Sequence, residues 1–247
     1  MMPFFSVLLM LSIVLLSPVM SESYVLAENQ PKECVILLHG LARTSGSMDT
    51  MARELQQAGF VTVNIDYPST EKKIEDLSEE AVSQGVISCR EQQADTLHFV
   101  THSMGGILVR YYLLLHNIDE LGRVVMLSPP NKGSEVVDTI GDWSSFQWYN
   151  GPAGGQLGTG EDSMVLQLGP VNFPLGIITG NSPAFYDGWF ADMIPGQNDG
   201  KVSVERAKVE GMTDFLVLPH NHTFIMSQED VIDQTIFFLR HGKFDNH

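Results

Sequence analysis

The stretch from 97 to 110, LHFVTHSMGGILVR, constrains the fold more than any other part of the chain. Leu97–Val100 is a short apolar run typical of a buried strand, and apolar residues recur at helical spacing from Ile107 onward. The tight turn between them carries Ser103. A serine on a sharp strand-to-helix turn is typical of a nucleophile elbow, in which the hydroxyl stands exposed above the strand end. The alternative is an ordinary turn in which Ser103 only caps the helix.

The turn itself sets steric and electrostatic conditions. Because strand and helix approach each other closely there, small residues are needed, and Gly105 supplies one. The usual G-x-S-x-G pattern fails at one position, because Thr101 replaces its first glycine. The N–H groups at the start of the following helix point toward Ser103, so negative charge developing there would be stabilised.

Other segments of the chain alternate between strand and helix patterns. Such alternation predicts βαβ units and a mainly parallel sheet of about six strands with helices on both faces, an α/β fold. Ligand sites in such sheets lie beyond the carboxyl ends of the strands. The further predicted strands are 35–38, 60–65, 122–127, 175–179 and 215–218, and the predicted helices are 45–58, 71–82 and 229–240.

Charge and composition exclude several classes of function. The 247 residues are 43% hydrophobic and 18% charged, as in a globular domain, and carry a formal net charge of −16. A phosphate-binding surface needs clustered Lys and Arg, so we expect neither nucleic-acid binding nor electrostatic docking on anionic membranes. No Cys or His pair has metal-ligand spacing, so we expect no metal and no cofactor.

The N-terminal segment predicts export. Residues 4–16 are almost wholly apolar but too short to span a bilayer comfortably, and small residues follow, so residues 1–27 resemble a secretory signal peptide. No Lys or Arg precedes the apolar run, and an uncleaved anchor or a buried helix remains the alternative. We expect a periplasmic or extracellular domain over 28–247, with no membrane span after cleavage. In that setting Cys34 and Cys89, both placed at the sheet edge opposite the site, either form a disulfide or remain buried thiols.

A His-Gly turn follows the first strong strand, where α/β-hydrolases build half of an oxyanion hole. The expected donors are the backbone N–H groups of Leu41 and Met104, with Gly40 allowing close approach. His39 is expected to be structural, hydrogen-bonding the loop. His102 directly precedes Ser103 and is expected to support the site, although the sequence assigns no partner to it.

The later turns supply an acid and a base. Asp199 lies in a turn after the fifth strand, where the acid of a Ser, Asp, His order belongs, although Asp-Gly is also a common turn pair. Asp192 is the reserve candidate. The last strand is followed by two histidines, His220 and His222, either of which can serve as the base.

The region from about 131 to 174 is predicted to be an irregular insert, with a short helix over 133–140. An aromatic group beside several glycines either lines or caps an acyl pocket as a small lid, or packs a long loop onto the domain. The aromatic residues are Trp143, Phe146, Trp148 and Tyr149.

Four segments in order, HGLARTS, THSMGG, NDGKVSV and HTFIM, resemble the bacterial lipase- and esterase-like members of the α/β-hydrolase superfamily, in particular small exported hydrolases described as lipase-like or acyltransferase-like. The resemblance covers nearly all of the chain after the apolar segment. It implies Ser103 as nucleophile, Asp199 as acid and His222, directly before Thr-Phe, as base. Thr101 and the apparent lack of the leading antiparallel strands depart from the pattern, so a minimal version of the fold is expected.

The resemblance implies a serine carboxylester hydrolase acting through an acyl-enzyme on a small ester or lipid. An acyltransferase would use the same residues and differ only in whether an alcohol replaces water. A non-catalytic binding protein on the same fold is a third hypothesis, and peptidase or thioesterase variants stay open.

Overall fold

The computed structural model describes residues 31–141, 143–161 and 163–245, and the predicted signal segment lies outside this part. The strands are β1 (Glu33–Leu38), β2 (Val61–Ile65), β3 (Thr96–His102), β4 (Leu121–Leu127), β5 (Leu175–Gly180) and β6 (Asp214–Leu218). The helices are α2 (Asp49–Gln57), α3 (Ile74–Glu91), α4 (Met104–Leu115), α5 (Glu135–Ile140), α6 (Ser144–Gly155), α7 (Met164–Gln167), α8 (Gly188–Ala191), α9 (Val204–Ala207) and α10 (Glu229–His241), with 3₁₀ helices η1 (Ser45–Met48), η2 (Phe185–Asp187) and η3 (Ile225–Ser227).

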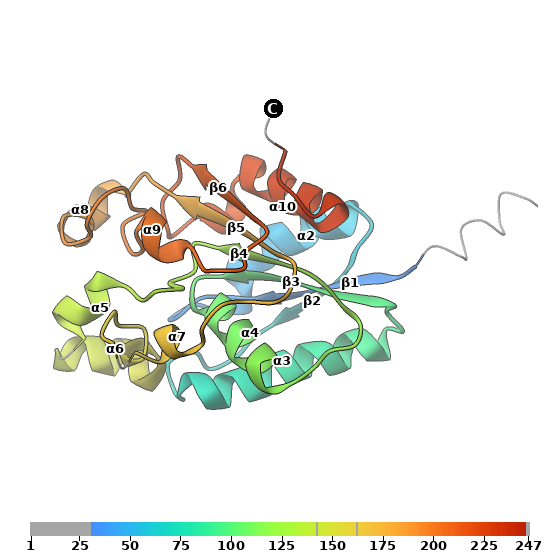
Figure 1. Ribbon diagram of the computed structural model, residues 1–247, viewed down its shortest axis with the longest axis horizontal. Helices are drawn as coiled ribbons and strands as arrows, with labels where there is room; N and C mark the ends of the chain where they lie inside the picture. The colour runs from blue at the N-terminus through green and yellow to red at the C-terminus, as the bar shows by residue number, and fades with distance from the viewer. Residues whose placement is uncertain (1–30, 142, 162, 246–247) are drawn as a thin grey trace, which may run out of the picture. The chain divides into compact units, whose positions relative to one another are not determined.

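All described strands pair in one parallel sheet in the order β2-β1-β3-β4-β5-β6. Helices α3 and α4 cover one face and α2 and α10 cover the other (Figure 1). The predicted α/β fold of six mainly parallel strands is therefore confirmed. Because every strand runs the same way, all six carboxyl ends meet at one edge of the sheet.

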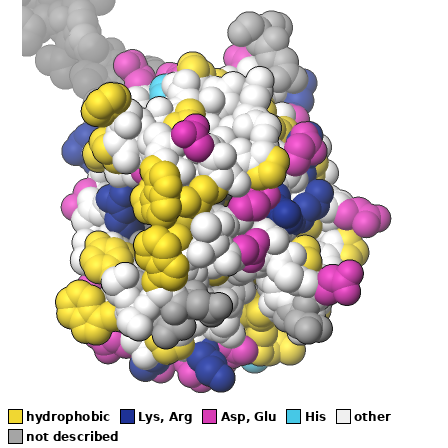
Figure 2. All heavy atoms as spheres, turned by 90° about the vertical axis from the view of Figure 1, so that its left-hand side faces the viewer, with side chains coloured by type: hydrophobic (Ala, Val, Ile, Leu, Met, Phe, Trp, Pro, Cys, Tyr) yellow, Lys and Arg dark blue, Asp and Glu magenta, His cyan; other side chains and the backbone are white. Residues whose placement is uncertain are grey.

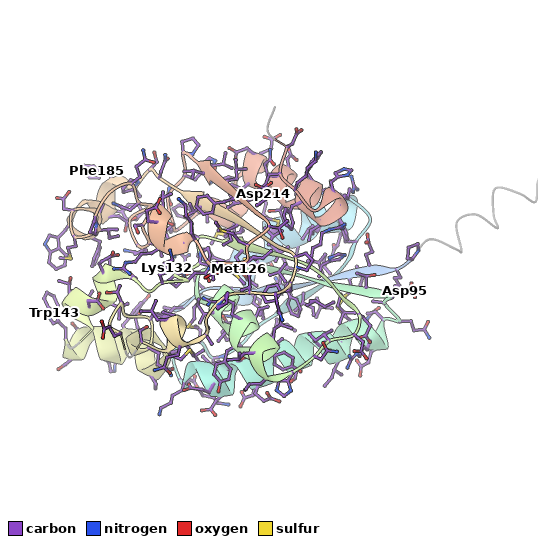
Figure 3. The ribbon with its side chains drawn as sticks, viewed as in Figure 1. Asp95, Met126, Lys132, Trp143, Phe185 and Asp214 are labelled. Atoms are coloured by element: carbon purple, nitrogen blue, oxygen red, sulfur yellow. A yellow bond between two sulfur atoms is a disulfide. The ribbon has the colours of Figure 1, made fainter. Side chains whose placement is uncertain are left out.

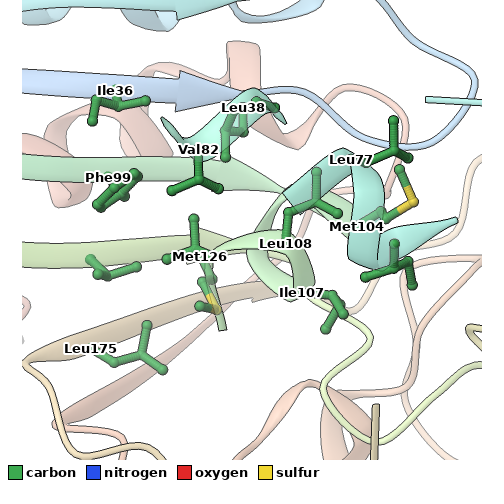
Figure 4. Close-up of a cluster of buried hydrophobic side chains, with 14 of the residues drawn as sticks. Ile36, Leu38, Leu77, Val82, Phe99, Met104, Ile107, Leu108, Met126 and Leu175 are labelled. Atoms are coloured by element: carbon green, nitrogen blue, oxygen red, sulfur yellow. The ribbon is translucent and has the colours of Figure 1, made fainter. Parts of the chain in front are cut away.

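The sheet is buried on both faces, which explains its continuous apolar strands. In β1, Val35 and Leu37 pack toward α2 and α10, whereas Ile36 and Leu38 pack toward α3 and α4. Figure 4 shows the second of these layers, where Phe99 of β3 lies among side chains from several elements. Each such side chain contributes about 1.5–3 kcal/mol by leaving water, so this core fixes the strand ends that carry the site.

Helix α3 corrects one sequence prediction. The pattern predicted a helix over 71–82, but α3 begins at Ile74 and continues to Glu91. Gly85 interrupts the apolar pattern, and a Cβ there would lie 2.4 Å from the Ile36 side chain. The glycine therefore allows close packing of α3 on β1, and tertiary contact overrides its low helix propensity.

The insert is more regular than predicted, because α5, α6 and α7 occupy much of 131–174. Helix α6 kinks at Gly151, where φ is 61° and a Cβ would collide with the Thr70 carbonyl oxygen. Gln156, after α6, accepts a hydrogen bond from the Ile74 N–H at 2.8 Å, at the start of α3. These contacts with distant segments fix the insert, and local sequence patterns do not reveal them.

Cys34 at the start of β1 and Cys89 near the end of α3 are joined in a disulfide, with their Cα atoms 5.8 Å apart. The bond lies at the edge of the sheet opposite the strand ends that carry the site, as the disulfide alternative required. In the described part of the chain, no helix has the length and apolar character needed to cross a membrane.

Candidate active site

Ser103 lies at the carboxyl end of β3 and immediately before α4, in a backbone conformation that L-residues rarely adopt (φ 51°, ψ −121°). Ser103 lines a cavity and is 9% exposed. Gly105 permits this turn, because a Cβ there would lie 2.6 Å from the Leu38 carbonyl oxygen. A strained backbone held by close packing is the arrangement expected of a nucleophile elbow.

Thr101 occupies the position where the usual pattern has glycine, and the neighbouring Gly106 leaves space for its side chain. Its side chain is fully buried, and a Cβ on Gly106 would lie only 3.2 Å from its hydroxyl oxygen and 3.0 Å from the Met126 sulfur. The second glycine of THSMGG therefore makes the room that the threonine occupies. The departure from the pattern leaves the turn intact.

A continuous hydrogen-bond relay joins Ser103 after β3, Asp199 in the turn between α8 and α9, and His222 after β6. The Ser103 Oγ lies 3.0 Å from Nε2 of His222, and Nδ1 of His222 lies 2.8 Å from Oδ2 of Asp199. With neutral imidazole, the serine hydroxyl donates to Nε2, and Nδ1–H donates to the carboxylate. His220 turns away and lies 2.7 Å from the Asp230 carboxylate, so the geometry favours His222 between the two candidates.

Asp199 is fully buried in the turn after β5. Its other carboxylate oxygen accepts the backbone N–H groups of Lys201 and Val202 at 3.0 and 2.8 Å. Burial acts to raise the pKa of Asp199, but the charge and hydrogen bond of His222, with smaller effects of Ser128 and the Val202 N–H, outweigh it, so the pKa lies below its ordinary value. Asp192, the reserve candidate, caps the end of α8, is exposed, and is not part of this relay.

Gly180, at the end of β5, is a site residue that the sequence did not reveal. A Cβ there would lie 2.1 Å from the His220 carbonyl oxygen and 2.9 Å from the Asp199 Cβ. Only glycine lets the loops after β5 and β6 approach each other this closely. A glycine at the last position of a buried apolar strand was the available signal.

The loop after β1 brings Leu41 to the cavity, while Met104 begins α4 directly after Ser103. Among the described residues, nothing accepts a hydrogen bond from the Leu41 N–H, and the first N–H groups of a helix have no acceptor within it. A Cβ on Gly40 would lie 3.2 Å from the Ser103 Cβ, so the loop reaches the serine only because residue 40 is glycine. The backbone at Gly40, next to Leu41, therefore lies close to Ser103, and Met104 follows Ser103 directly.

His39 is structural, as expected. Its ring stacks on Tyr67 with centroids 4.0 Å apart, Nδ1 donates to the Gly40 carbonyl at 2.8 Å, and the Tyr67 hydroxyl donates to the His39 carbonyl. Burial lowers the pKa of His39, so the ring is neutral. It holds the loop that carries Leu41.

His102 does have a partner, which the sequence did not reveal. Its Nε2–H donates to the His222 carbonyl oxygen at 3.0 Å, and the two rings lie 4.9 Å apart. Burial, together with the neighbouring His222, lowers the pKa of His102 well below its ordinary value. The neutral ring therefore braces the loop that carries His222.

A cavity of about 560 Å³ opens above Ser103, within the size range of small-molecule sites. Arg43 and Lys201 are its charged lining residues among those described, and Tyr149 of the insert also lines it. The apolar side chains around it are Leu41, Pro130, Val136, Val137, Ile140, Leu157, Phe190 and Val202.

Exposed aromatic side chains lie at the end of the molecule that carries the insert and α8. Trp143 and Trp189, from different segments, lie with ring centroids 5.9 Å apart. Figure 3 shows Trp143 and Phe185 at the end opposite Asp95, which precedes β3, and Figure 2 shows hydrophobic side chains gathered on that face. Trp143, Trp148 and Tyr149 are all more than half exposed, so these described aromatics of the insert are not packed inward, and the alternative of a loop held by its own aromatics is not favoured. The Phe146 side chain lies outside the described part.

The buried neutral histidines predict an acid-sensitive fold. The pKa values of His39, His98 and His102 are all lowered, chiefly by burial, so below about pH 6.5 the unfolded chain binds protons that the folded chain does not. The free energy of unfolding should therefore fall between pH 6.5 and 5, by up to about 1.4 kcal/mol per pH unit for each histidine. Urea denaturation at each pH measures the free energy of unfolding, and 0.5 M NaCl in the buffer screens the net charge.

The control is His116→Gln, because His116 is exposed and pairs with Glu79 on the surface. This variant should keep nearly the same pH dependence. A free energy of unfolding that stays flat or rises from pH 6.5 to 5 would contradict the neutral state of the buried rings.

The family model Hydrolase_4, described as serine aminopeptidase, S33, matches residues 29–150. No curated protein matches the sequence significantly.

Several solved structures share the fold. Mature lipase BlEst2 from Bacillus licheniformis superposes with a TM-score of 0.67 at 20% identity, covering 85% of this chain and 94% of its own. Phospholipase PlaB from Legionella pneumophila superposes with a TM-score of 0.61 at 21% identity, covering 72% of this chain and 44% of its own. A thermophilic esterase from Thermogutta terrifontis superposes with a TM-score of 0.56 at 15% identity, covering 86% of this chain and 91% of its own. The chain therefore has the α/β-hydrolase fold, and its residues 29–150 match the Hydrolase_4 family model.

Proposed function

We propose that this protein is a serine carboxylester hydrolase with Ser103 as nucleophile. The observation that carries the proposal is the relay from Asp199 through His222 to Ser103, which lines the cavity. A serine hydroxyl is a weak nucleophile at neutral pH, and a hydrogen-bonded imidazole that can take its proton makes it reactive.

In the proposed mechanism His222 removes the Ser103 proton as Oγ attacks the ester carbonyl carbon. The oxyanion that forms accepts hydrogen bonds from the N–H groups of Leu41 and Met104. His222 then protonates the departing alcohol, which leaves an acyl group on Ser103. Water, deprotonated by His222, releases the acid and restores the hydroxyl. Asp199 orients the ring and stabilises its protonated form.

An ester with an apolar acyl group suits the cavity better than a peptide with a free N-terminus. The matched family model is described as serine aminopeptidase, which raises the second possibility. Binding a free α-ammonium group favours a carboxylate, and the described lining contains none. The apolar wall formed by Val136, Ile140 and Leu157 instead suits an acyl chain.

We further infer that the protein is exported. The disulfide between Cys34 and Cys89 supports this, because such bonds persist in oxidising compartments. The apolar segment at 4–16 has the composition of a signal peptide.

The test is turnover of p-nitrophenyl esters from acetate to octanoate, with L-alanine p-nitroanilide as the aminopeptidase substrate. We expect ester hydrolysis with a preference set by acyl length and little cleavage of the anilide. Adding glycerol tests acyl transfer, because new glycerol esters would identify an alcohol acceptor. Cleavage of the anilide without ester turnover would overturn the proposal.

A further inference from the structure

The cavity above Ser103 has a charge composition opposite to that of the whole chain. The chain has 30 Asp and Glu against 14 Lys and Arg. Among the described residues that line the cavity, however, Arg43 and Lys201 carry charge and no aspartate or glutamate is present. Salt screens distant surface carboxylates over about 8 Å, and the two buried carboxylates behind the lining, Asp187 and Asp199, are paired with Lys201 and hydrogen-bonded to His222, respectively.

The two cations differ in how their charge is compensated. The Lys201 ammonium lies 2.9 Å from a carboxylate oxygen of the buried Asp187 and 4.0 Å from the centroid of the Phe190 ring. Arg43 has no carboxylate within ion-pair distance among the described residues. Within the part of the chain that the structure describes, Arg43 donates one hydrogen bond, from Nη2 to the Thr223 carbonyl at 3.2 Å. A guanidinium has five N–H donors, so Arg43 keeps donors and charge for a ligand.

The position of Arg43 places this charge beside the reacting groups. It lies two residues after Leu41, in the loop that follows β1, and it contacts Thr223, the neighbour of His222. Its charge reaches the buried His102, whose pKa it lowers after the larger effects of burial and His222. The apolar wall is formed by other elements, α5 among them, and Arg43 is not part of it.

We propose that Arg43 forms an anion-binding subsite, and that the substrate is an ester whose alcohol part carries a phosphate or carboxylate group. This rests on the proposed ester hydrolysis. The apolar wall takes the acyl chain, and the guanidinium binds the anion through paired N–H donors, a geometry that matches both phosphate and carboxylate. Partial burial strengthens the interaction relative to open water.

Two matched substrate pairs test the subsite and separate its two possible anions. For carboxylate, 3-(butyryloxy)benzoate is compared with 3-(butyryloxy)benzamide. For phosphate, 1-butyrylglycerol 3-phosphate is compared with 1-butyrylglycerol. The readout is the ratio of kcat/KM for the anionic ester to that for its neutral partner, measured from butyrate release.

In Arg43→Gln this ratio should fall about tenfold for at least one pair, the size expected for a charge-assisted hydrogen bond. Arg43→Lys should restore part of it. The matched control is Arg53→Gln, which removes the same charge from an exposed site on α2 and should leave both ratios unchanged. The pair with the larger fall identifies the preferred anion.

The Thr223 contact gives Arg43 a competing role as a positioning residue for His222. That role alone would lower kcat/KM equally for both members of each pair, and unchanged ratios would overturn the subsite. Failure of ester hydrolysis itself is recognised separately, because the wild type would then turn over neither member of a pair. In that case the affinity of the Ser103→Ala protein for butyl phosphate is measured by calorimetry, with and without the Arg43→Gln substitution. An equal affinity in the two proteins would overturn the proposal.

Discussion

Replacing Ser103 with alanine should lower kcat/KM for short p-nitrophenyl esters by about 10⁴-fold or more, because no acyl-enzyme can form. The fold should survive. The hydroxyl is hydrogen-bonded to His222, and alanine keeps the Cβ, so the strained backbone and its packing stay as they are. Initial rates over a range of ester concentrations, with thermal unfolding of the same preparation, give both results.

The matched control is Ser88→Ala on α3, a serine remote from the cavity lining. It should keep full turnover. If Ser103→Ala hydrolysed esters at the wild-type rate, another nucleophile would have to be sought. Loss of folding in Ser103→Ala would contradict the reading that its hydroxyl serves chemistry and not stability.

Replacing Asp199 with asparagine should lower kcat by about 10⁴-fold with little change in KM. An amide in this place removes the negative charge that stabilises imidazolium, and it favours the tautomer with the proton on Nε2, which cannot accept from Ser103. The backbone N–H groups of Lys201 and Val202 still find an acceptor in the amide oxygen, so the turn should persist. Steady-state kinetics near neutral pH measures the effect.

Asp192→Asn is the control, because Asp192 is the other acid that the sequence offered and it lies exposed at the end of α8. It should leave kcat within about twofold, as surface substitutions usually leave the protein little changed. A large fall of kcat in Asp192→Asn, together with a small fall in Asp199→Asn, would reverse the assignment of the acid.

Much of the fold followed from the sequence because its signals are local. Buried parallel strands are continuous apolar runs, and the turns after them carry Gly, Asp or Ser for conformational reasons. Ser103, Asp199 and His222 could therefore be placed at one sheet edge before any distance was known. Choosing between His220 and His222 needed the resemblance to a family, because both follow the same strand.

The features that were missed depend on contacts between distant segments. The predicted helix ended at 82, before Gly85, and the predicted strand ended at 179, before Gly180. Each glycine matters through a close approach to a distant segment, Ile36 for Gly85 and His220 for Gly180. His102 had no visible partner because its acceptor, the His222 carbonyl, is 120 residues away. The helices of the insert form where Gly151 and Gln156 meet segments near α3.

The central claim is that Ser103 is made nucleophilic by His222, and reaction with a fluorophosphonate followed by peptide mass mapping tests it most directly. We predict one phosphonyl adduct per chain, on Ser103, with labelling strongly slowed in His222→Ala and unchanged in His220→Ala. An intact, folded protein that takes no label, or takes it on a different residue, would contradict the account.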